Sequence, residues 1–328
     1  MPEFANQSFL VTGAAGFIGS VVCRQLLEQG ASVVGVDNLN DYYDVELKRW
    51  RLKEFASSQS FDFVELDIEN QPALEKLFAA NKFAGVINLA ARAGVRYSMD
   101  NPHVYFTTNV MGSLNLLELC RQHQVGKYIL ASTSSLYAGQ PMPFQESLPV
   151  NEPISPYAAS KKAAEVMAYT YHRQFDIDVT VCRYFTVYGP AGRPDMSPFR
   201  FAKWIATGQP ITLFGDGTQS RDFTYVDDIA AGTLLALKKV GFEVINLGGG
   251  NKPYSINEMI GKLEQLLGEK AQIENLPFHS ADMKETWADI GKAQSILGWQ
   301  PQVSFDAGLE KTVAWYRDNL PWTSSIPT

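Results

Sequence analysis

Short apolar runs alternate with longer amphipathic stretches through the first half of the chain. The runs are continuous and rich in β-branched or aromatic residues, which is typical of strands buried on both faces of a parallel sheet. We therefore expect strands at Phe9–Thr12, Ser32–Asp37, Asp62–Asp67, Gly85–Ala90, Lys127–Ser132 and Val179–Tyr184.

The stretches between these runs have helical spacing. Their apolar positions recur every three or four residues, so they share one face of a helix. The expected helices are Phe17–Gln29, Pro72–Ala80, Val104–His123 and Pro156–Gln174. Because strand and helix alternate, the order predicts an α/β fold with a doubly wound parallel sheet, the Rossmann arrangement.

The sequence pattern changes after Tyr184. Glycine and proline become frequent there, and they separate shorter predicted elements. This predicts a smaller C-terminal α/β lobe for a substrate, over residues 187–328, beside a cofactor-binding domain over residues 1–186. A segment near 222–248 is expected to return to the first sheet. The elements expected here are helices at Asp227–Lys239, Ser255–Leu267 and Phe305–Asn319 and a strand at Glu243–Leu247.

Composition and charge argue against a nucleic-acid-binding, membrane or metal-binding protein. The 328 residues carry a net charge of −7 and their lysines and arginines do not cluster, which argues against a nucleic-acid partner. No basic leader and no apolar stretch of bilayer length occur, so we expect a cytoplasmic protein without membrane contact. Cys23, Cys120 and Cys182 stand singly, and we expect buried thiols and no metal site.

A glycine-rich turn connects the first strand to the first helix. Gly13, Gly16 and Gly19 are spaced three residues apart, one residue looser than the standard dinucleotide fingerprint. Glycines there let the backbone approach a pyrophosphate, whose charge is stabilised by the helix N-terminus. The strand–turn–helix context favours a dinucleotide site over a simple tight turn.

The end of the second strand indicates which dinucleotide binds. Asp37 follows the turn by about 20 residues, where a carboxylate accepts hydrogen bonds from both hydroxyls of the adenosine ribose. Since a carboxylate repels a 2′-phosphate, NAD is expected rather than NADP. Asp67 ends the third strand in the same way and is a weaker candidate for the adenine end. The alternative for Asp37 is a solvated residue at a strand end.

Tyr157 and Lys161 are candidates for acid–base chemistry. Ser155 and Pro156 begin a helix, which puts positions 157 and 161 on one face. A neighbouring ammonium and a cationic nicotinamide both favour the phenolate, so Tyr157 is a credible general base. Alone, this spacing is more often a surface pair on a helix. After a dinucleotide turn and a strand that ends in hydroxyl residues, it indicates a dehydrogenase-like site.

Four consecutive hydroxyl residues, Ser132 to Ser135, end the fifth strand, at the edge where doubly wound sheets bind ligands. One could share a proton with Tyr157 while others hold a polar substrate group; the alternative is a turn that caps its own backbone. Arg96, Arg193 and Arg221 lie in loop-like contexts, and each is either an anion clamp or a surface charge.

These motifs resemble those of the extended short-chain dehydrogenases that act on nucleotide sugars, from Phe9 to Trp315. The shared signatures are Val11–Gly19, Leu89–Ala91, Ser155–Lys161, Arg183–Pro190 and Arg221–Asp228. Within that group, three segments look like those of UDP-glucuronate 4-epimerases: Asp37–Asp44, Ala93–Ser98 and Gly192–Met196.

The resemblance implies roles by position. Thr133, Tyr157 and Lys161 match the catalytic triad. The cofactor site would comprise Gly13, Gly16, Phe17, Ile18, Gly19, Asp37, Asn38, Asp67, Ile68, Leu89, Ala90, Ala91, Tyr157, Lys161 and Tyr184. The substrate site would comprise Arg96, Thr133, Ser134, Ser135, Thr186, Arg193 and Arg221, with Arg221 on the pyrophosphate.

The reaction implied is reversible 4-epimerisation of UDP-glucuronate to UDP-galacturonate through a 4-keto sugar, with NAD kept bound. A homodimer pairing the Val104–His123 and Pro156–Gln174 helices is also implied. The alternatives are a UDP-glucose/galactose 4-epimerase, a 4,6-dehydratase or a UDP-uronate decarboxylase. In the last two, acidic residues follow the threonine, where this chain has Ser134 and Ser135. Two departures are Thr186, in place of an asparagine of the glucose/galactose enzymes, and Ala138, in place of a glycine.

Overall fold

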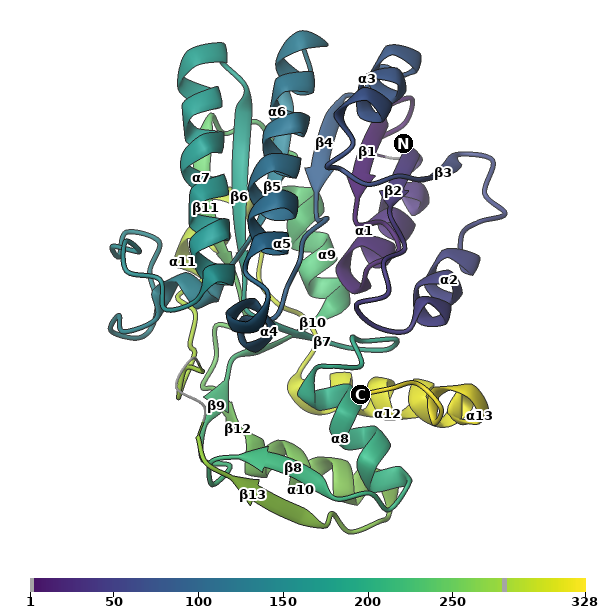
Figure 1. Cartoon of the computed structure of the whole chain (residues 1–328), viewed down its shortest axis with the longest axis vertical. Helices are drawn as coiled ribbons and strands as arrows, with labels where there is room; N and C mark the ends of the chain where they lie inside the picture. Colours follow the sequence, from purple (N-terminus) through teal and green to yellow (C-terminus); the bar gives the residue numbers. More distant parts are fainter. Residues whose placement is uncertain (1–2, 279–281) are drawn as a thin grey trace.

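The computed structural model describes residues 3–278 and 282–328. Its centre is a seven-stranded sheet in the order β11-β6-β5-β4-β1-β2-β3, in which every neighbouring pair is parallel (Figure 1). The strands are β1 (Ser8–Thr12), β2 (Ser32–Asp37), β3 (Phe61–Glu65), β4 (Gly85–Asn88), β5 (Lys127–Thr133), β6 (Asp178–Tyr184) and β11 (Phe242–Leu247). The predicted doubly wound sheet is therefore confirmed, and Asp67 lies just beyond β3 rather than inside it.

Helices cover both faces of this sheet. One face is buried by α1 (Phe17–Glu28), α9 (Val226–Leu235) and α11 (Gly291–Leu297), which contribute Val22, Ile229 and Leu297 to a shared apolar core. The other is buried by α3 (Gln71–Ala80), α6 (Ser113–Gln122) and α7 (Pro156–Phe175), which contribute Leu74, Leu116 and Ala168. These buried faces match the apolar spacing from which most of these helices were predicted.

The helix expected at Val104–His123 is interrupted. Its parts are α5 (His103–Phe106), a π-helical turn η1 (Thr107–Gly112) and α6. Within the π turn, Asn109 is buried and its amide brackets the backbone of Arg92, accepting from the nitrogen at 2.9 Å and donating to the oxygen at 3.0 Å. The wider turn therefore fixes the loop that follows β4, a detail that apolar spacing does not encode.

The smaller lobe lies below the carboxyl ends of the sheet strands (Figure 1). The parallel pair β8 (Ile211–Phe214) and β13 (Ile273–Leu276) packs with α8 (Ser197–Ala206), α10 (Ile256–Leu267) and α12 (Phe305–Asp318) around Trp204, Met259 and Leu309. Short pairs are β7 (Thr186–Tyr188) with β10 (Phe223–Tyr225) and β9 (Ser220–Arg221) with β12 (Tyr254–Ser255); α13 (Leu320–Thr323) follows α12.

The chain crosses between the two lobes more than once. After β10 it re-enters the large lobe as α9, and β11 then pairs with β6 along the sheet edge. We propose to keep the boundary near residue 186, with residues 187–328 as the substrate lobe and the segment near 222–248 as the return. None of the helices in the described ranges has the length and apolar character needed to cross a bilayer.

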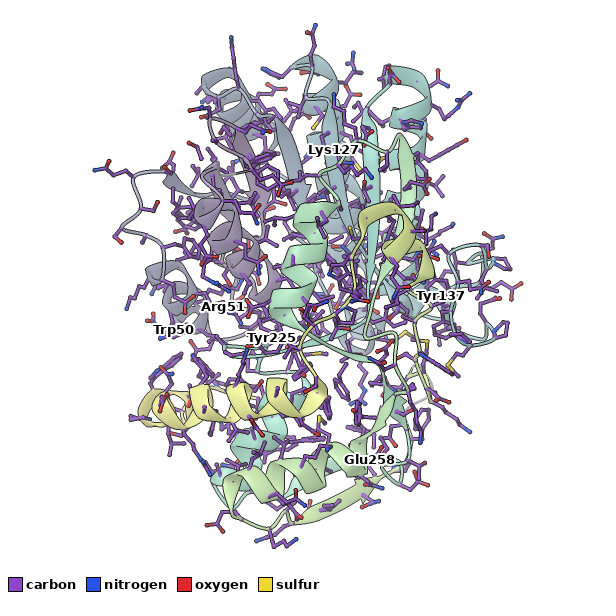
Figure 2. The ribbon with its side chains drawn as sticks, turned by 180° about the vertical axis from the view of Figure 1, so that it is seen from behind. Trp50, Arg51, Lys127, Tyr137, Tyr225 and Glu258 are labelled. Atoms are coloured by element: carbon purple, nitrogen blue, oxygen red, sulfur yellow. The ribbon has the colours of Figure 1, made fainter. Side chains whose placement is uncertain are left out.

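Three short elements within residues 1–186 were not expected. They are α2 (Val45–Lys53), α4 (Val95–Asp100) and the 3-10 turn η2 (Ser134–Tyr137). α2 carries Trp50 and Arg51, which lie where the large lobe meets α12 (Figure 2). It has a weak apolar stripe, because Lys48 and Arg51 are among its buried residues, and this explains why spacing alone did not reveal it.

Candidate active site

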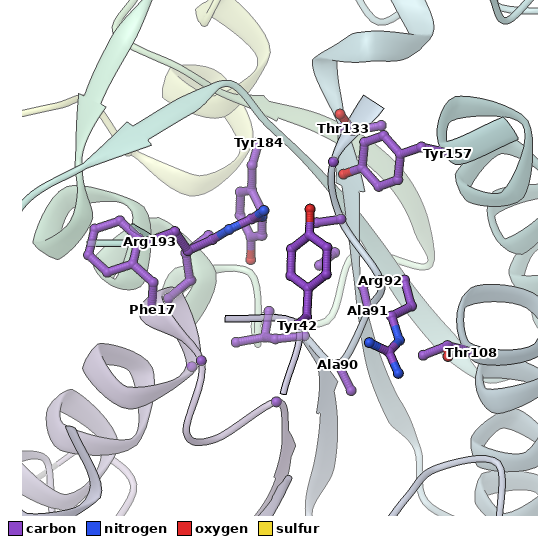
Figure 3. Close-up of a pocket in the computed structure, with 18 of the residues that line it drawn as sticks. Phe17, Tyr42, Ala90, Ala91, Arg92, Thr108, Thr133, Tyr157, Tyr184 and Arg193 are labelled. Atoms are coloured by element: carbon purple, nitrogen blue, oxygen red, sulfur yellow. The ribbon is translucent and has the colours of Figure 1, made fainter. Parts of the chain in front are cut away.

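A cavity of about 360 Å³ opens at the carboxyl ends of the central strands (Figure 3). It lies where β1 separates β2 from β4, the position at which the winding of the chain reverses and ligands of such sheets bind. Every residue predicted for the cofactor lines it, as do Thr133, Ser134, Ser135, Thr186 and Arg193. Arg96 and Arg221 do not.

The glycine-rich turn forms the floor of this cavity. Gly13 has a φ of +71°, and a Cβ there would lie 2.8 Å from the backbone nitrogen of Ala90. A Cβ on Gly19 would lie 2.0 Å from the Gly13 oxygen, so α1 can begin this close to the strand only with glycine. The turn therefore leaves the N-terminus of α1 facing the cavity, as an anion site requires.

Asp37 is held in place by backbone donors. Its side chain is 7% exposed and accepts hydrogen bonds from the nitrogen atoms of Ala15 at 3.2 Å and Leu39 at 2.9 Å. Next to it, Asn38 donates to Asp67 Oδ2 at 2.6 Å. The two carboxylates predicted for the adenosine end thus line the same part of the cavity.

Two charged residues near Asp37, Lys48 and Arg92, were not predicted from the sequence. Lys48 Nζ lies 3.7 Å from Asp37 Oδ1, and burial lowers the pKa of this lysine although Asp37 opposes the shift. Arg92 donates to Asn40 Oδ1 at 3.3 Å, and its positive charge also lowers the pKa of Lys48. Their only sequence signal is that they lie within or beside the segments that resemble UDP-glucuronate 4-epimerases.

Arg51 links the glycine-rich turn to the segment before Arg193. This side chain is 2% exposed and donates to the carbonyl oxygen of Ala191 from both Nε, at 3.0 Å, and Nη2, at 2.8 Å. Its third nitrogen, Nη1, donates to the Ala15 oxygen at 3.1 Å and to the Tyr43 hydroxyl at 2.6 Å. A buried guanidinium therefore fixes one wall of the cavity relative to the other.

Tyr157 and Thr133 meet on the opposite side of the cavity, where α7 faces the end of β5 (Figure 3). Ser155 caps α7 by accepting from Ala158 N at 3.2 Å, with Pro156 in the first turn, as predicted. Burial raises the pKa of Tyr157, whereas the neighbouring Thr133 hydroxyl and the charge of Arg193 lower it. The two side chains are thus arranged for proton exchange.

Lys161 lies one turn further along α7 and is buried. Its Nζ donates to the carbonyl oxygen of Ala131 at 2.9 Å. Burial lowers its pKa to about 8, and the negative charge of Glu165 limits the fall. The cation whose charge lowers the pKa of Tyr157 is Arg193. The influence of Lys161 on this phenol, which we expect from their spacing on the helix, remains a prediction.

A buried ion pair lies behind these residues. Glu165 accepts from Arg183 Nε at 2.9 Å and Nη2 at 2.7 Å, and from Ser132 Oγ at 2.6 Å. Arg183 also donates to the Tyr137 hydroxyl at 2.7 Å, which donates to Asn246 Oδ1 at 2.8 Å. Ser132 therefore braces α7 against β5, and it lines the cavity together with the three hydroxyl residues that follow it.

The turn after these hydroxyl residues accommodates Ala138, which stands where the resemblance led us to expect a glycine. Ala138 has a φ of −51°, which suits any residue, and the left-handed position falls on Gly139, at +79°. Thr133 Oγ1 accepts from Ser135 N at 3.1 Å and starts η2. The alanine is therefore tolerated because the glycine is needed one residue later.

The three predicted arginines divide into two groups. Arg193 points into the cavity and is paired side-on with Asp195 (Figure 3). Arg96 and Arg221 lie in a second cluster, where Arg96 forms an ion pair with Asp282 and covers the ring of Phe214. Burial lowers the pKa of Arg221, Asp282 raises it and Arg96 lowers it again. Asp282, the acidic residue of this cluster, was not predicted from the sequence.

The residues of this cavity offer a dinucleotide site and a proton-exchanging pair, and the described parts of the chain hold no cluster of histidine, cysteine and carboxylate side chains suited to a metal ion. The family model described as "NAD dependent epimerase/dehydratase family" matches residues 9–248. The chain belongs to this family. The resemblance seen in the sequence is thereby confirmed, together with its cofactor, NAD.

Other members of the NAD-dependent epimerase/dehydratase family show how close the similarity is. The chain is 57% identical to the UDP-glucuronate 4-epimerase of Thermodesulfobacterium geofontis, over 97% of this chain and 98% of that one. A crystal structure of UDP-glucuronic acid 4-epimerase from Bacillus cereus in complex with UDP-glucuronic acid and NAD is 39% identical, with a TM-score of 0.91 over 95% of this chain and 100% of that one.

The family also includes enzymes for neutral sugars. A structure of UDP-glucose 4-epimerase with UDP-glucose from Thermotoga maritima is 34% identical, with a TM-score of 0.87 over 96% of this chain and 100% of that one. The fold is therefore shared across different nucleotide sugars, and the side chains of the cavity carry the distinction between them.

Proposed function

We propose that this protein catalyses the reversible 4-epimerisation of UDP-glucuronate and UDP-galacturonate. The observation that carries the proposal is a guanidinium, Arg193, in the same cavity as the Tyr157–Thr133 pair and the dinucleotide turn. A sugar with a carboxylate beside the reacting carbon needs such a cation. The relative from T. geofontis, similar over nearly its whole length, is a UDP-glucuronate 4-epimerase.

The residues present fit NAD. The glycine-rich turn and the start of α1 would hold the pyrophosphate, Asp37 the adenosine ribose, and Lys161 and Tyr184 the nicotinamide end. Asp37 is buried, so a 2′-phosphate would meet a fixed negative charge. When bound, NAD supplies hydride acceptance and return at carbon 4 of the sugar.

Tyr157 is the proposed general base. Its phenolate removes the proton of the 4-hydroxyl as carbon 4 is oxidised, and the resulting phenol returns the proton when carbon 4 is reduced from the other face. The Thr133 hydroxyl lines the cavity beside this phenol, lowers its pKa and can share that proton. Arg193 lowers the pKa of the phenol, which offsets part of the effect of burial.

The hydroxyl groups at the end of β5 are proposed to hold the uronate carboxylate. Thr133, Ser134 and Ser135 line the cavity together, and Thr186 lines it from β7. Oxidation at carbon 4 produces a β-keto acid, which loses carbon dioxide when the carboxylate bond aligns with the carbonyl π system. Holding the carboxylate near the carbonyl plane prevents that alignment.

The other reactions on this scaffold fit less well. A 4,6-dehydratase or a uronate decarboxylase is expected to have acidic residues after the threonine, and Ser134 and Ser135 occupy those positions. A UDP-glucose/galactose 4-epimerase needs no cation beside the sugar, yet Arg193 points into the cavity (Figure 3).

For the nucleotide, we propose that Arg96 and Arg221 bind the pyrophosphate of UDP. Both side chains lie outside the main cavity. They are close enough to each other for the charge of Arg96 to lower the pKa of Arg221. Two guanidiniums beside a single carboxylate, Asp282, leave positive charge for an anionic group.

We further propose a homodimer that pairs the helices expected at Val104–His123 and Pro156–Gln174, which are α5 to α6 and α7 in the structure. Large apolar side chains are exposed there, including Phe106 (44%), Met111 (50%), Val166 (53%) and Tyr169 (48%). Such a patch is typical of a protein interface. For the location we propose the cytoplasm, because Cys23, Cys120 and Cys182 are free, buried thiols, which a reducing compartment preserves.

The test is an incubation of the purified protein with UDP-glucuronate, followed by NMR of the products. UDP-galacturonate without net formation of NADH supports the proposal. Stoichiometric NADH, a requirement for NADPH, or a 4-keto-6-deoxy or pentose product contradicts it. A parallel incubation with UDP-glucose distinguishes a uronate enzyme from one for neutral hexoses.

A further inference from the structure

Arg193 is held by Asp195 in a way that leaves part of its guanidinium free. Nε donates to Asp195 Oδ1 at 3.0 Å and Nη2 donates to Oδ2 at 2.5 Å. This side-on geometry uses one edge of the fork, and Nη1 has no hydrogen-bond partner among the described residues. The unused amino group is therefore available to a ligand in the cavity that Arg193 lines.

Tyr42 closes the other side of Arg193. The guanidinium carbon lies 5.8 Å from the centre of the Tyr42 ring, and the hydroxyl of Tyr42 reaches into the same part of the cavity as the guanidinium (Figure 3). Burial raises the pKa of Tyr42, Asp195 raises it further and Arg193 lowers it. Arg193 thus contacts both side chains, through hydrogen bonds to Asp195 and through its position beside the Tyr42 ring.

The position of Tyr42 is set by the cofactor side of the cavity. Its backbone nitrogen donates to Asn40 Oδ1 at 3.2 Å, and Asn40 donates in turn to Asn38 Oδ1 at 2.7 Å, next to Asp37. A Cβ on Gly94 would lie 2.6 Å from the Tyr42 hydroxyl, so a glycine is needed for the ring to reach this place. Tyr42 is therefore fixed between the loops after β2 and β4.

The carboxyl group of Asp195 is partly buried and keeps its negative charge beside Arg193. Burial alone would raise the pKa of its carboxyl, but Arg193 holds it below its usual range, so the pair stays charged at neutral pH. Arg200 contributes to the same effect from α8. A long, flexible arginine side chain loses much rotamer freedom when it is fixed, and a partner that fixes it beforehand spares the substrate that cost.

We propose that Asp195 and Tyr42 are positioning residues that hold Arg193 with Nη1 towards the substrate carboxylate and so create the preference for a uronate over a neutral hexose. This rests on the proposed function and deepens it. The two residues come from different lobes, so the preference requires both walls of the cavity. Neither residue needs to touch the reacting carbon.

The experiment measures the dissociation constants of UDP-glucuronate and UDP-glucose on the NAD-saturated protein, with Tyr157→Phe as the background to prevent turnover. The two ligands differ in the carboxylate, so the ratio of their constants reports all interactions with that group, from Arg193 and from the hydroxyl residues at the end of β5. Asp195→Asn removes the charge and keeps the shape; Tyr42→Leu removes the ring that lies beside the guanidinium. Each is expected to reduce the ratio at least tenfold, about 1.4 kcal/mol, while the UDP-glucose constant changes less than threefold.

A cycle with Arg193→Met shows whether the two residues act through the arginine. In the Arg193→Met background, Asp195→Asn and Tyr42→Leu should change the ratio less than twofold. An equal loss in both backgrounds would overturn the proposal, because a general structural role does not depend on Arg193. Melting temperature and NAD content monitor folding, and if Asp195→Asn fails to fold, Tyr42→Leu decides.

Two further outcomes are informative. Tighter binding of UDP-glucuronate by Asp195→Asn would show that Asp195 repels the substrate, and would overturn the proposal. If the unsubstituted protein epimerises UDP-glucuronate and both variants keep its ratio, only this inference fails. A protein that neither prefers nor converts UDP-glucuronate would overturn the proposed function as well.

Discussion

Lys161 Nζ donates a hydrogen bond to the carbonyl oxygen of Ala131, which ties the ammonium of α7 to the strand that ends at Thr133. The cation is therefore fixed to the scaffold on the same helix as the phenol it is expected to influence. Burial lowers its pKa to about 8, so its charge diminishes as the pH rises through that value.

Lys161→Met should move the rising limb of the pH profile of kcat to higher pH. The phenolate of Tyr157 loses a neighbouring cation, so its pKa rises, by about one unit or more. The profile is measured with NAD-saturated protein and UDP-glucuronate. Lys162→Met, the next residue on α7, is the control and should keep the parent profile. Coincident profiles for all three proteins would contradict a role of Lys161 in tuning the phenol.

Tyr157→Phe should lower kcat by at least about 10²-fold, because a general acid–base group typically contributes 10² to 10⁴-fold. Melting temperature and NAD content should remain those of the parent, since only a hydroxyl is lost. Thr170→Val removes an exposed hydroxyl from the same helix and should leave the rate unchanged. A rate within a few-fold of the parent in Tyr157→Phe would show that another group is the base.

Replacing both Ser134 and Ser135 by alanine should change the products. Hydrogen bonds to a charged group contribute about 1.5 to 3 kcal/mol each, enough for a tenfold bias. The double variant is expected to release more carbon dioxide and UDP-pentose relative to UDP-galacturonate, measured by NMR and carbon dioxide trapping. If reduction simply outpaces carbon dioxide loss, the rate falls and the product ratio stays constant, and the carboxylate grip is wrong.

Asp222→Asn should stabilise the protein more at pH 8 than at pH 5. Asp222 is 2% exposed, accepts from Ala288 N at 2.8 Å, and burial raises its pKa to about 7. An unfolded aspartate has a pKa near 3.9, so the folded state binds more protons between about pH 4 and 7, and the free energy of unfolding falls as the pH rises through that range.

Asparagine keeps a carbonyl oxygen for the Ala288 and Gly250 amides and carries no charge to desolvate. The difference in melting temperature between variant and parent should therefore grow from pH 5 to pH 8. Asp195→Asn is the control, because its carboxyl pKa is lowered and its charge is constant over this range. A constant difference for Asp222→Asn would mean that this carboxyl is ionised throughout.

The parts of the molecule that follow from local pattern were predictable. Strands such as β5 are buried on both sides and are therefore continuously apolar, and the Ser155–Pro156 start of α7 is a local signal. The dinucleotide turn is equally local, since a Cβ on Gly19 would meet the oxygen of Gly13. These features predicted the sheet, the dinucleotide turn and the helix that carries Tyr157, whereas Thr133 was chosen among the four hydroxyl residues by the family resemblance alone.

Features that depend on distant contacts were not predictable. α2 buries Arg51 because the carbonyl of Ala191 receives its hydrogen bonds, a contact across 140 positions. Asp195 and Tyr42 acquire meaning only when the loop after β2 reaches the segment around Arg193. The π turn at Asn109 likewise responds to the backbone of Arg92 rather than to its own sequence.

The pairing of β11 with β6 has a consequence for synthesis of the chain. While the ribosome has released only the residues up to β6, β6 is the edge strand of the sheet, and the face that α9 later buries is exposed to water. α9 covers that face and β11 replaces β6 at the edge only after residue 247 has emerged. A nascent chain interrupted between these points therefore exposes apolar surface, which favours aggregation.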